Sequence, residues 1–250
     1  MSLPHEAVDI TVDGQHIGGS LIVPEVGGAS AAAALFVHGW GGSQAESLAA
    51  ARAVAAVGFT CLIFDLRGHA GTLGLRDTVT REENLRDVVT AYDVLAKRVG
   101  VDRSRILLAG SSYGAYLGAI ATGLRPLRWL SMQGPAIYKN AGWNLPKCEL
   151  HCDPDFDEFL RRAHRPADNR ALEAGERFRG DVLLVESGND RTMPHPVVAS
   201  YVGAFVNAHS LTHRIIEGAD HGLSRETWKA AYIESLVRWL KGTTARATVG

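Results

Sequence analysis

The amino-acid sequence predicts an α/β fold in which a mostly parallel sheet carries helices on both faces. Apolar runs of strand length alternate with helical patterns along the chain, and this alternation is typical of α/β proteins. Most of the strand runs are continuously apolar, which indicates that both faces of the sheet are buried and that the strands pair in parallel. A chain of 250 residues suits one domain of this class, so we expect residues 1–250 to form a single domain.

Each element follows from a local pattern. Residues 7–23 alternate around Asp13-Gly14, which is typical of a β-hairpin. The clearest helix is expected over residues 80–98, where Thr80 and Glu83 can form a capping box. Further strands are expected at 33–37, 60–65, 105–109, 129–133 and 181–186, with an edge strand at 211–217. Further helices are expected near 45–57, 113–124, 168–178 and 196–206, and a last one from Ser224.

Residues 139–167 form a long irregular insertion between two of the expected strands. An insertion of this length in a compact domain is usually functional or disordered. It carries the apolar side chains Trp143, Leu145, Phe156 and Phe159. We interpret the insertion as a small lid whose four apolar residues line the substrate pocket. A helix packed on the domain is the alternative interpretation of the same pattern.

Composition and charge exclude several classes of protein. Lys and Arg number 26 and Asp and Glu number 27, so the formal net charge is −1, whereas a nucleic-acid-binding protein normally has a basic excess. The sequence contains no run of about 18 apolar residues and no pattern of a signal peptide. We therefore expect a cytoplasmic protein with no nucleic-acid partner and no membrane association.

The three cysteines give no sign of a disulfide framework or a metal site. Cys61, Cys148 and Cys152 are an odd and small set, which fits a reducing compartment. Cys148 and Cys152 flank a histidine, but a zinc site needs four ligands and no second cluster is present. We expect free thiols and no bound metal.

A pentapeptide after the strand at 105–109 has the pattern of an activated serine. Gly110-Ser111-Ser112-Tyr113-Gly114 fits G-x-S-x-G, and it lies between an expected strand and an expected helix, as that motif requires. The turn is so sharp that glycines are needed two residues before and two residues after the serine. We therefore predict that Ser112 is exposed at the carboxyl edge of the sheet as the nucleophile.

A serine hydroxyl is a weak nucleophile, so it needs a base and an acid that orients the base. His221 lies in the loop after the last expected strand, at the same sheet edge as Ser112, and we predict that it is the base. Asp190 follows the strand at 181–186, and we predict that it is the acid. His38 ends a strand beside a glycine, where a role in holding the loop is expected.

An acyl-transfer site also needs two donors for the developing oxyanion. Tyr113 is the first residue of the helix after Ser112, so its backbone N–H can point to the site. The second donor is expected from the glycine-rich loop at 38–42, and we predict the backbone N–H of Trp40. Packing of the Trp40 ring beside the pocket is the alternative role for that residue.

With these motifs in order, the chain resembles the α/β-hydrolase fold over nearly its whole length. The motifs that carry the resemblance are His38-Gly39-Trp40, Asp65-Leu66-Arg67-Gly68-His69, Gly110-Ser111-Ser112-Tyr113-Gly114, Asp190 and Asp220-His221-Gly222. The resemblance implies an eight-stranded sheet, a triad of Ser112, Asp190 and His221 in the chain order of that fold, and no cofactor.

Two branches of the superfamily match different segments. The segment His38-Gly39-Trp40-Gly41-Gly42 resembles small carboxylesterases, including the feruloyl or cinnamoyl esterase type. The segment from Asp102 to Ile106 together with Ser112 to Tyr116 resembles the catalytic domain of the prolyl-oligopeptidase family, although Ala115 stands where that family usually has glycine. Dienelactone hydrolases use a cysteine nucleophile and haloalkane dehalogenases an aspartate, and this chain has serine at position 112.

We therefore expect a serine hydrolase that cleaves carboxylic esters through an acyl-enzyme on Ser112, with His221 as base and Asp190 as orienting acid. The same triad would serve a peptidase, an amidase or a thioesterase. A non-catalytic, hydrolase-like binding protein is the alternative from a different class. The expected partner is a small-molecule ester, and the expected assembly is a monomer or a homodimer.

Overall fold

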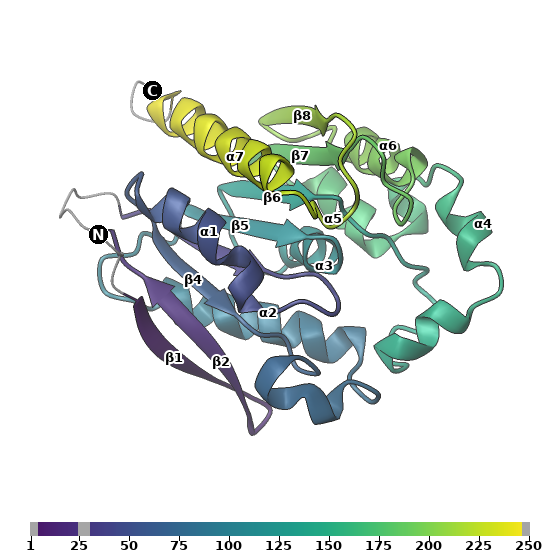
Figure 1. Ribbon diagram of the computed structural model, residues 1–250, viewed down its shortest axis with the longest axis horizontal. Helices are drawn as coiled ribbons and strands as arrows, with labels where there is room; N and C mark the ends of the chain where they lie inside the picture. Colours follow the sequence, from purple (N-terminus) through teal and green to yellow (C-terminus); the bar gives the residue numbers. More distant parts are fainter. Residues whose placement is uncertain (1–4, 25–30, 247–250) are drawn as a thin grey trace.

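Within residues 5–24 and 31–246, which the computed structural model describes, the chain forms one eight-stranded sheet (Figure 1). The order of the strands across the sheet is β1-β2-β4-β3-β5-β6-β7-β8. The strands are β1 (His5–Val12), β2 (Gln15–Ile22), β3 (Ala33–Val37), β4 (Thr60–Phe64), β5 (Ile106–Ser111), β6 (Trp129–Gln133), β7 (Asp181–Ser187) and β8 (Ser210–Ile216). The predicted α/β fold with a mostly parallel sheet is confirmed.

The strand pairing brings several loops to one edge of the sheet. The β1–β2 hairpin is antiparallel and β2 pairs with β4 in the antiparallel sense, but all pairings from β4 to β8 are parallel. Val37, the last residue of β3, lies opposite Phe64 and Gly110 on its two neighbours. The loops that follow β3, β4, β5, β6, β7 and β8 therefore leave from the same carboxyl edge, where ligands bind in sheets of this kind.

Helices cover both faces of the sheet, as the apolar strands predict. The longer helices are α1 (Gln44–Ala55), α2 (Arg81–Ala96), α3 (Tyr113–Ala121), α5 (Arg170–Arg177), α6 (His195–Ala204) and α7 (Glu226–Arg246). Helices α1 and α7 pack on one face, and α2, α3, α5 and α6 lie on the other (Figure 1). All five residues of β3 are buried between these two layers, whereas β8 at the sheet edge remains largely accessible.

Local sequence signals set several element ends. Thr80 caps α2 by accepting a hydrogen bond from the backbone N–H of Glu83, and the Glu83 carboxylate accepts from the backbone N–H of Thr80, so the predicted capping box is confirmed. Helix α7 begins at Glu226 rather than at Ser224, because the Ser224 backbone N–H binds the Asp220 carboxylate in a preceding turn. Strand β5 continues to Ser111 because that residue still pairs with Gln133 of β6.

The segment 139–167 contains short helical turns rather than a strand. They are η2 (Lys147–Cys152), α4 (Phe156–Leu160) and η3 (Pro166–Asp168), and a further turn, η1 (Ala70–Leu75), follows β4. Figure 1 shows α4 beyond the ends of the parallel strands, at the right of the view. An antiparallel bridge, Thr80 to Pro146, joins the segment to the start of α2. Among the described residues, no helix combines the length and the apolar character that crossing a bilayer requires.

Candidate active site at Ser112

Ser112 lies in a strained turn between β5 and α3. Its backbone has φ 49° and ψ −111°, a left-handed conformation that costs about 1–3 kcal/mol in a residue other than glycine. The turn is possible because its flanking glycines have no side chains. A Cβ on Gly110 would lie 2.5 Å from the backbone nitrogen of Ala115, and a Cβ on Gly114 would lie 2.2 Å from the carbonyl oxygen of Val37. The G-x-S-x-G spacing therefore reflects steric necessity at both glycines.

The structure brings together the three side chains that the sequence predicts as nucleophile, base and acid. His221 Nε2 lies 2.8 Å from Ser112 Oγ, and His221 Nδ1 lies 2.7 Å from Asp190 Oδ2. Because an ionised carboxylate only accepts hydrogen bonds, Nδ1 carries the proton toward Asp190. The lone pair of Nε2 then faces the Ser112 hydroxyl. This tautomer is the one that can receive the hydroxyl proton.

Backbone donors fix the Asp190 carboxylate, which the sequence predicts as the acid. Asp190 Oδ1 accepts hydrogen bonds of 2.8 Å from the backbone N–H groups of Thr192 and Met193, which leaves Oδ2 directed to the imidazole. The Asp190 side chain is 6% exposed and that of His221 is 21% exposed. A ligand can therefore reach the imidazole, while the carboxylate that orients it is shielded.

The loop after β3 approaches Ser112 through a glycine. A Cβ on Gly39 would lie 3.4 Å from the Cβ of Ser112, so the loop backbone runs beside the serine. Gly41 donates its backbone N–H to Nε2 of the buried His69 at 3.0 Å. Burial and the nearby His38 lower the pKa of His69 to about 4, so His69 remains a neutral acceptor for this bond near neutral pH.

His38 has the predicted structural role. Its Nε2 accepts the backbone N–H of Leu66 at 3.1 Å, and its Nδ1 lies 2.7 Å from the carbonyl oxygen of Gly39. Burial lowers the pKa of His38, so the ring is neutral and ties the loop after β3 to the loop after β4.

The sequence predicts the backbone N–H groups of Tyr113 and Trp40 as donors to an oxyanion. Tyr113 opens α3 directly after Ser112, and Trp40 follows Gly39 in the loop beside the serine. Among residues 5–24 and 31–246, neither of these N–H groups has a hydrogen-bond partner. The Trp40 ring also packs edge-on against Tyr113, with 5.6 Å between the ring centroids, so that residue has a packing role as well.

Gln133, at the end of β6, belongs to the same cluster, although the sequence reasoning did not single it out. Its backbone oxygen accepts the N–H of Ser112 at 2.8 Å. Its side chain joins Ser111 to the backbone of His221. A polar residue at the carboxyl end of an apolar strand was the available signal, because that sheet edge is where sites are built.

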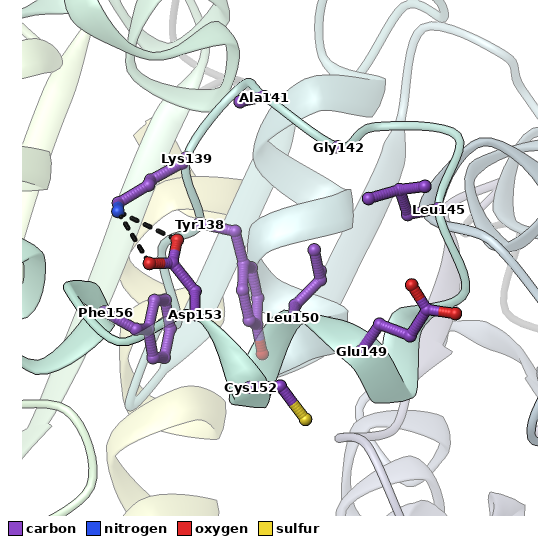
Figure 2. A pocket seen from close by; sticks show the side chains of 10 residues that line it. All are labelled: Tyr138, Lys139, Ala141, Gly142, Leu145, Glu149, Leu150, Cys152, Asp153 and Phe156. Carbon is purple, nitrogen blue, oxygen red and sulfur yellow. Dashed lines mark hydrogen bonds and ion pairs between the residues drawn. The ribbon is translucent and has the colours of Figure 1, made fainter.

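A hollow of about 390 Å³ lies within the segment 139–167 (Figure 2). Leu145 and Phe156, two of the four residues predicted to line a substrate pocket, border it together with Tyr138 and Leu150. Ser112 does not line this hollow. The Tyr138 ring, which forms one wall, also packs edge-on against Tyr113 with 5.8 Å between centroids.

The other two predicted pocket residues, Trp143 and Phe159, are buried and do not line the hollow. The Trp143 indole N–H donates to the Glu82 carboxylate at 2.6 Å, and its ring lies 3.8 Å from the Arg170 guanidinium carbon. The Phe159 ring packs on His164 with 4.1 Å between centroids. Trp143 therefore ties the segment 139–167 to α2, and Phe159 packs within the segment.

Lys147 is a fully buried basic residue in the segment 139–167. Its Nζ lies over the rings of Trp40, Tyr113 and Tyr138, at 4.8, 5.2 and 4.5 Å from their centroids. Such contacts with aromatic faces favour the charged amine. Burial, assisted by the positive charge of Arg81, nevertheless lowers the pKa of Lys147 to about 7.

The described residues offer no metal-binding cluster. Within residues 5–24 and 31–246, no group of three or more His, Cys, Asp or Glu side chains is arranged to hold a metal ion. Cys61, Cys148 and Cys152 are free thiols in the structure.

Comparison with known proteins gives three kinds of similarity. The model of the alpha/beta hydrolase family matches residues 34–234. Two uncharacterised proteins of Mycobacterium tuberculosis, from strains CDC 1551 and H37Rv, are each 33% identical over 217 residues. That stretch is 84% of this chain and 70% of each of theirs.

Solved structures with the same fold include three from other organisms. Est1E from Butyrivibrio proteoclasticus, solved with ferulic acid bound, has a TM-score of 0.72 and 16% identity, covering 98% of this chain and 100% of its own. A dienelactone hydrolase from Anabaena variabilis has a TM-score of 0.69 and 20% identity, covering 96% and 98%. An acylaminoacyl peptidase from Pyrococcus horikoshii has a TM-score of 0.66 and 17% identity, covering 90% of this chain and 38% of its own.

Proposed function

The chain belongs to the alpha/beta hydrolase family, and from this membership and the geometry around Ser112 we propose that it is a serine hydrolase that cleaves carboxylic esters. The observation that carries the proposal is the continuous chain of hydrogen bonds from Ser112 Oγ through His221 to Asp190, with distances of 2.8 and 2.7 Å. These distances are within the range in which a base can take a hydroxyl proton.

In the first half of the proposed reaction, Ser112 Oγ attacks the ester carbonyl carbon while its proton passes to His221 Nε2. The carbonyl oxygen becomes an oxyanion, and the backbone N–H groups of Trp40 and Tyr113 donate to it. Asp190 accepts from Nδ1–H and stabilises the imidazolium. The intermediate collapses, the bond to the alkoxy oxygen breaks, and the leaving alcohol takes the proton from Nε2.

In the second half, water attacks the acyl carbon of the ester that now joins the substrate to Ser112. His221 Nε2 takes one proton from the water, and the same two N–H groups receive the second oxyanion. The bond to Ser112 Oγ then breaks, and His221 returns the proton to the serine. This half releases a carboxylic acid and regenerates the enzyme. The whole reaction consumes only the ester and one water molecule.

The proposal predicts that Ser112→Ala lowers kcat/KM for short p-nitrophenyl esters by about 10⁴-fold or more, because no acyl-enzyme can form. A fluorophosphonate probe should label the wild type and fail to label Ser112→Ala. The matched control is Ser111→Ala, which removes the neighbouring hydroxyl and leaves Ser112 in place. It should retain labelling.

Equal rates in the wild type and in Ser112→Ala would refute the assignment. Hydrolysis of aminoacyl anilides but not of esters, with the same labelling, would show a peptidase or amidase that uses these residues. A correctly folded wild type that neither hydrolyses esters nor takes the probe would favour a non-catalytic binding protein.

A further inference from the structure

We propose that Gln133 is a positioning residue that holds the nucleophile and the base in register with one another, a role that rests on the proposed function. Gln133 is the last residue of β6, and β6 lies between β5, which leads to Ser112, and β7, which leads to Asp190. It is 4% exposed. A buried polar side chain at this point of the sheet needs hydrogen-bond partners.

The partners of Gln133 are residues on both sides of the reaction. Its backbone oxygen accepts the N–H of Ser112 at 2.8 Å. Its Nε2 donates to the backbone oxygen of His221 at 3.1 Å, and its Oε1 accepts the hydroxyl of Ser111 at 2.5 Å. Because a backbone carbonyl can only accept, the amide nitrogen must face His221 and the amide oxygen must face Ser111. The network therefore fixes the orientation of the amide.

The hydrogen bond from Gln133 holds the backbone of His221 itself, in the loop after β8. Other hydrogen bonds of that loop hold the neighbouring residues. Asn189 donates its backbone N–H to the carbonyl of Ala219 at 2.8 Å, and the Asp220 carboxylate accepts the N–H of Ser224. These bonds hold the residues on either side of His221. Within the described ranges, the backbone of His221 itself has no hydrogen-bond partner other than Gln133.

The distance between Ser112 Oγ and His221 Nε2 depends on where the two backbones lie. Gln133 forms a hydrogen bond with each of these two backbones, so one residue of β6 links their positions. Loss of the side-chain bonds would let the His221 loop move while the nucleophile stays in place. A shift of about 1 Å at reacting groups can cost about 100-fold in rate.

Gln133→Leu tests this role because it removes both side-chain bonds with a small change in volume. Ser111 and Gln133 border a hollow of about 420 Å³ that is lined mainly by α1 and α7, so the branched side chain has room. We expect kcat per labelled site to fall about 10–100-fold, with KM within about threefold of wild type. The matched control is Tyr92→Phe, which removes a hydrogen bond to the carbonyl of Pro126. Its kcat should stay within about twofold.

Gln133→Glu tests the hydrogen bond to His221 through the pH dependence of activity, which a purely structural role of Gln133 would leave unchanged. An ionised carboxylate cannot donate to the His221 carbonyl, whereas a protonated carboxyl group can. The activity of this variant relative to wild type should therefore rise as the pH falls, and the same ratio for Gln133→Leu should stay flat. Counting sites with a fluorophosphonate probe separates a slower enzyme from a smaller folded fraction.

An NMR measurement tests the positioning role without relying on hydrolysis. In a Ser112→Ala background, the Nδ1–H signal of His221 should shift or broaden in Gln133→Leu and remain in place in Tyr92→Phe. An unchanged signal, together with kcat per labelled site within twofold of wild type, would overturn the role of Gln133. If the wild type neither hydrolyses esters nor takes the probe, the proposed function fails, and the imidazole signal still decides whether Gln133 holds His221.

Discussion

The carboxyl edge of the sheet around Ser112 and the segment 139–167 use polar residues in opposite ways. At the sheet edge, His221 and Asp190 form short hydrogen bonds and part of the imidazole is exposed. In the segment, the amine of Lys147 is buried among three aromatic rings. The strand ends therefore fix the groups that we propose for catalysis through short hydrogen bonds, whereas the segment encloses a basic group among aromatic rings.

The two regions meet at Trp40 and Tyr113. Tyr113 follows Ser112 directly and Trp40 lies in the loop after β3, and Lys147 Nζ lies 4.8 Å from the Trp40 ring centroid and 5.2 Å from that of Tyr113. Lys147 of the segment 139–167 therefore packs against the rings of both residues that we propose as oxyanion donors. Changes in one region test whether the other depends on it.

The largest expected effect is at the turn of the sheet edge. In Gly114→Ala, the new Cβ would lie 2.2 Å from the Val37 carbonyl oxygen and 2.6 Å from that of His38. Backbone atoms must move, so we expect a loss of about 3 kcal/mol or more in unfolding free energy and loss of activity. Gly203→Ala is the matched control, because a Cβ there meets no atom within 4 Å. It should slightly stabilise α6, and chemical denaturation measures both. Wild-type stability in Gly114→Ala would contradict the steric role of this glycine.

The second effect concerns the buried cation and depends on pH. The pKa of Lys147 is about 7 in the folded protein against an ordinary value of 10.5, so between these values the unfolded chain binds more protons. Stability therefore rises with pH across this window, by about 2 kcal/mol between pH 7 and pH 9. Below pH 7 both states hold the proton and this contribution is lost.

Lys147→Met isolates this contribution because methionine does not titrate. Denaturant unfolding of both proteins at pH 7, 8 and 9 should show the wild type gaining stability relative to the variant. Parallel pH dependence of the two proteins would mean that Lys147 does not lose its proton in this range.

The smallest effect separates two of the residues in the segment 139–167. Trp143→Phe removes the hydrogen bond of 2.6 Å to the Glu82 carboxylate, and we expect a loss of about 1.5 kcal/mol. Leu145 is 50% exposed, so Leu145→Ala should change the unfolding free energy by less than about 0.5 kcal/mol. Thermal unfolding compares the two variants.

Ester hydrolysis then sharpens the comparison between these residues. If the hollow bordered by Leu145 receives part of the substrate, Leu145→Ala should change KM for long-chain esters while Trp143→Phe leaves it unchanged. Equal KM values for both variants would remove Leu145 from the substrate pocket.

The residues around Ser112 were predictable because each lies at the end of an element. Ser112 follows β5 and precedes α3, and Asp190 and His221 follow β7 and β8 at the same edge. Strand ends can be found from apolar runs, and parallel pairing then brings them together. The sequence therefore predicts that Ser112, Asp190 and His221 lie close together, although it gives no distances between them.

The same local patterns do not predict the contacts of Gln133, Lys147 and Trp143. The role of Gln133 depends on the register of β5 against β6, where Ser111 pairs with it, and on a loop 88 residues away. A lysine is normally expected in solvent, and nothing near Lys147 in the sequence shows that rings from three other parts of the chain enclose it. The apolar character of Trp143 predicts burial but not the surface against which it is buried.

Local sequence patterns determine the succession of strands and helices along the chain, the sharp turn at Ser112 and the polar residues at the carboxyl edge of the sheet. These features follow from local sterics and from periodic burial of apolar side chains, which act over a few residues. Tertiary packing determines which polar groups form hydrogen bonds, which residues of the segment 139–167 border the hollow and how Lys147 is buried. Those outcomes depend on strand register and on packing between distant elements, where a shift of about one residue exchanges one set of neighbours for another.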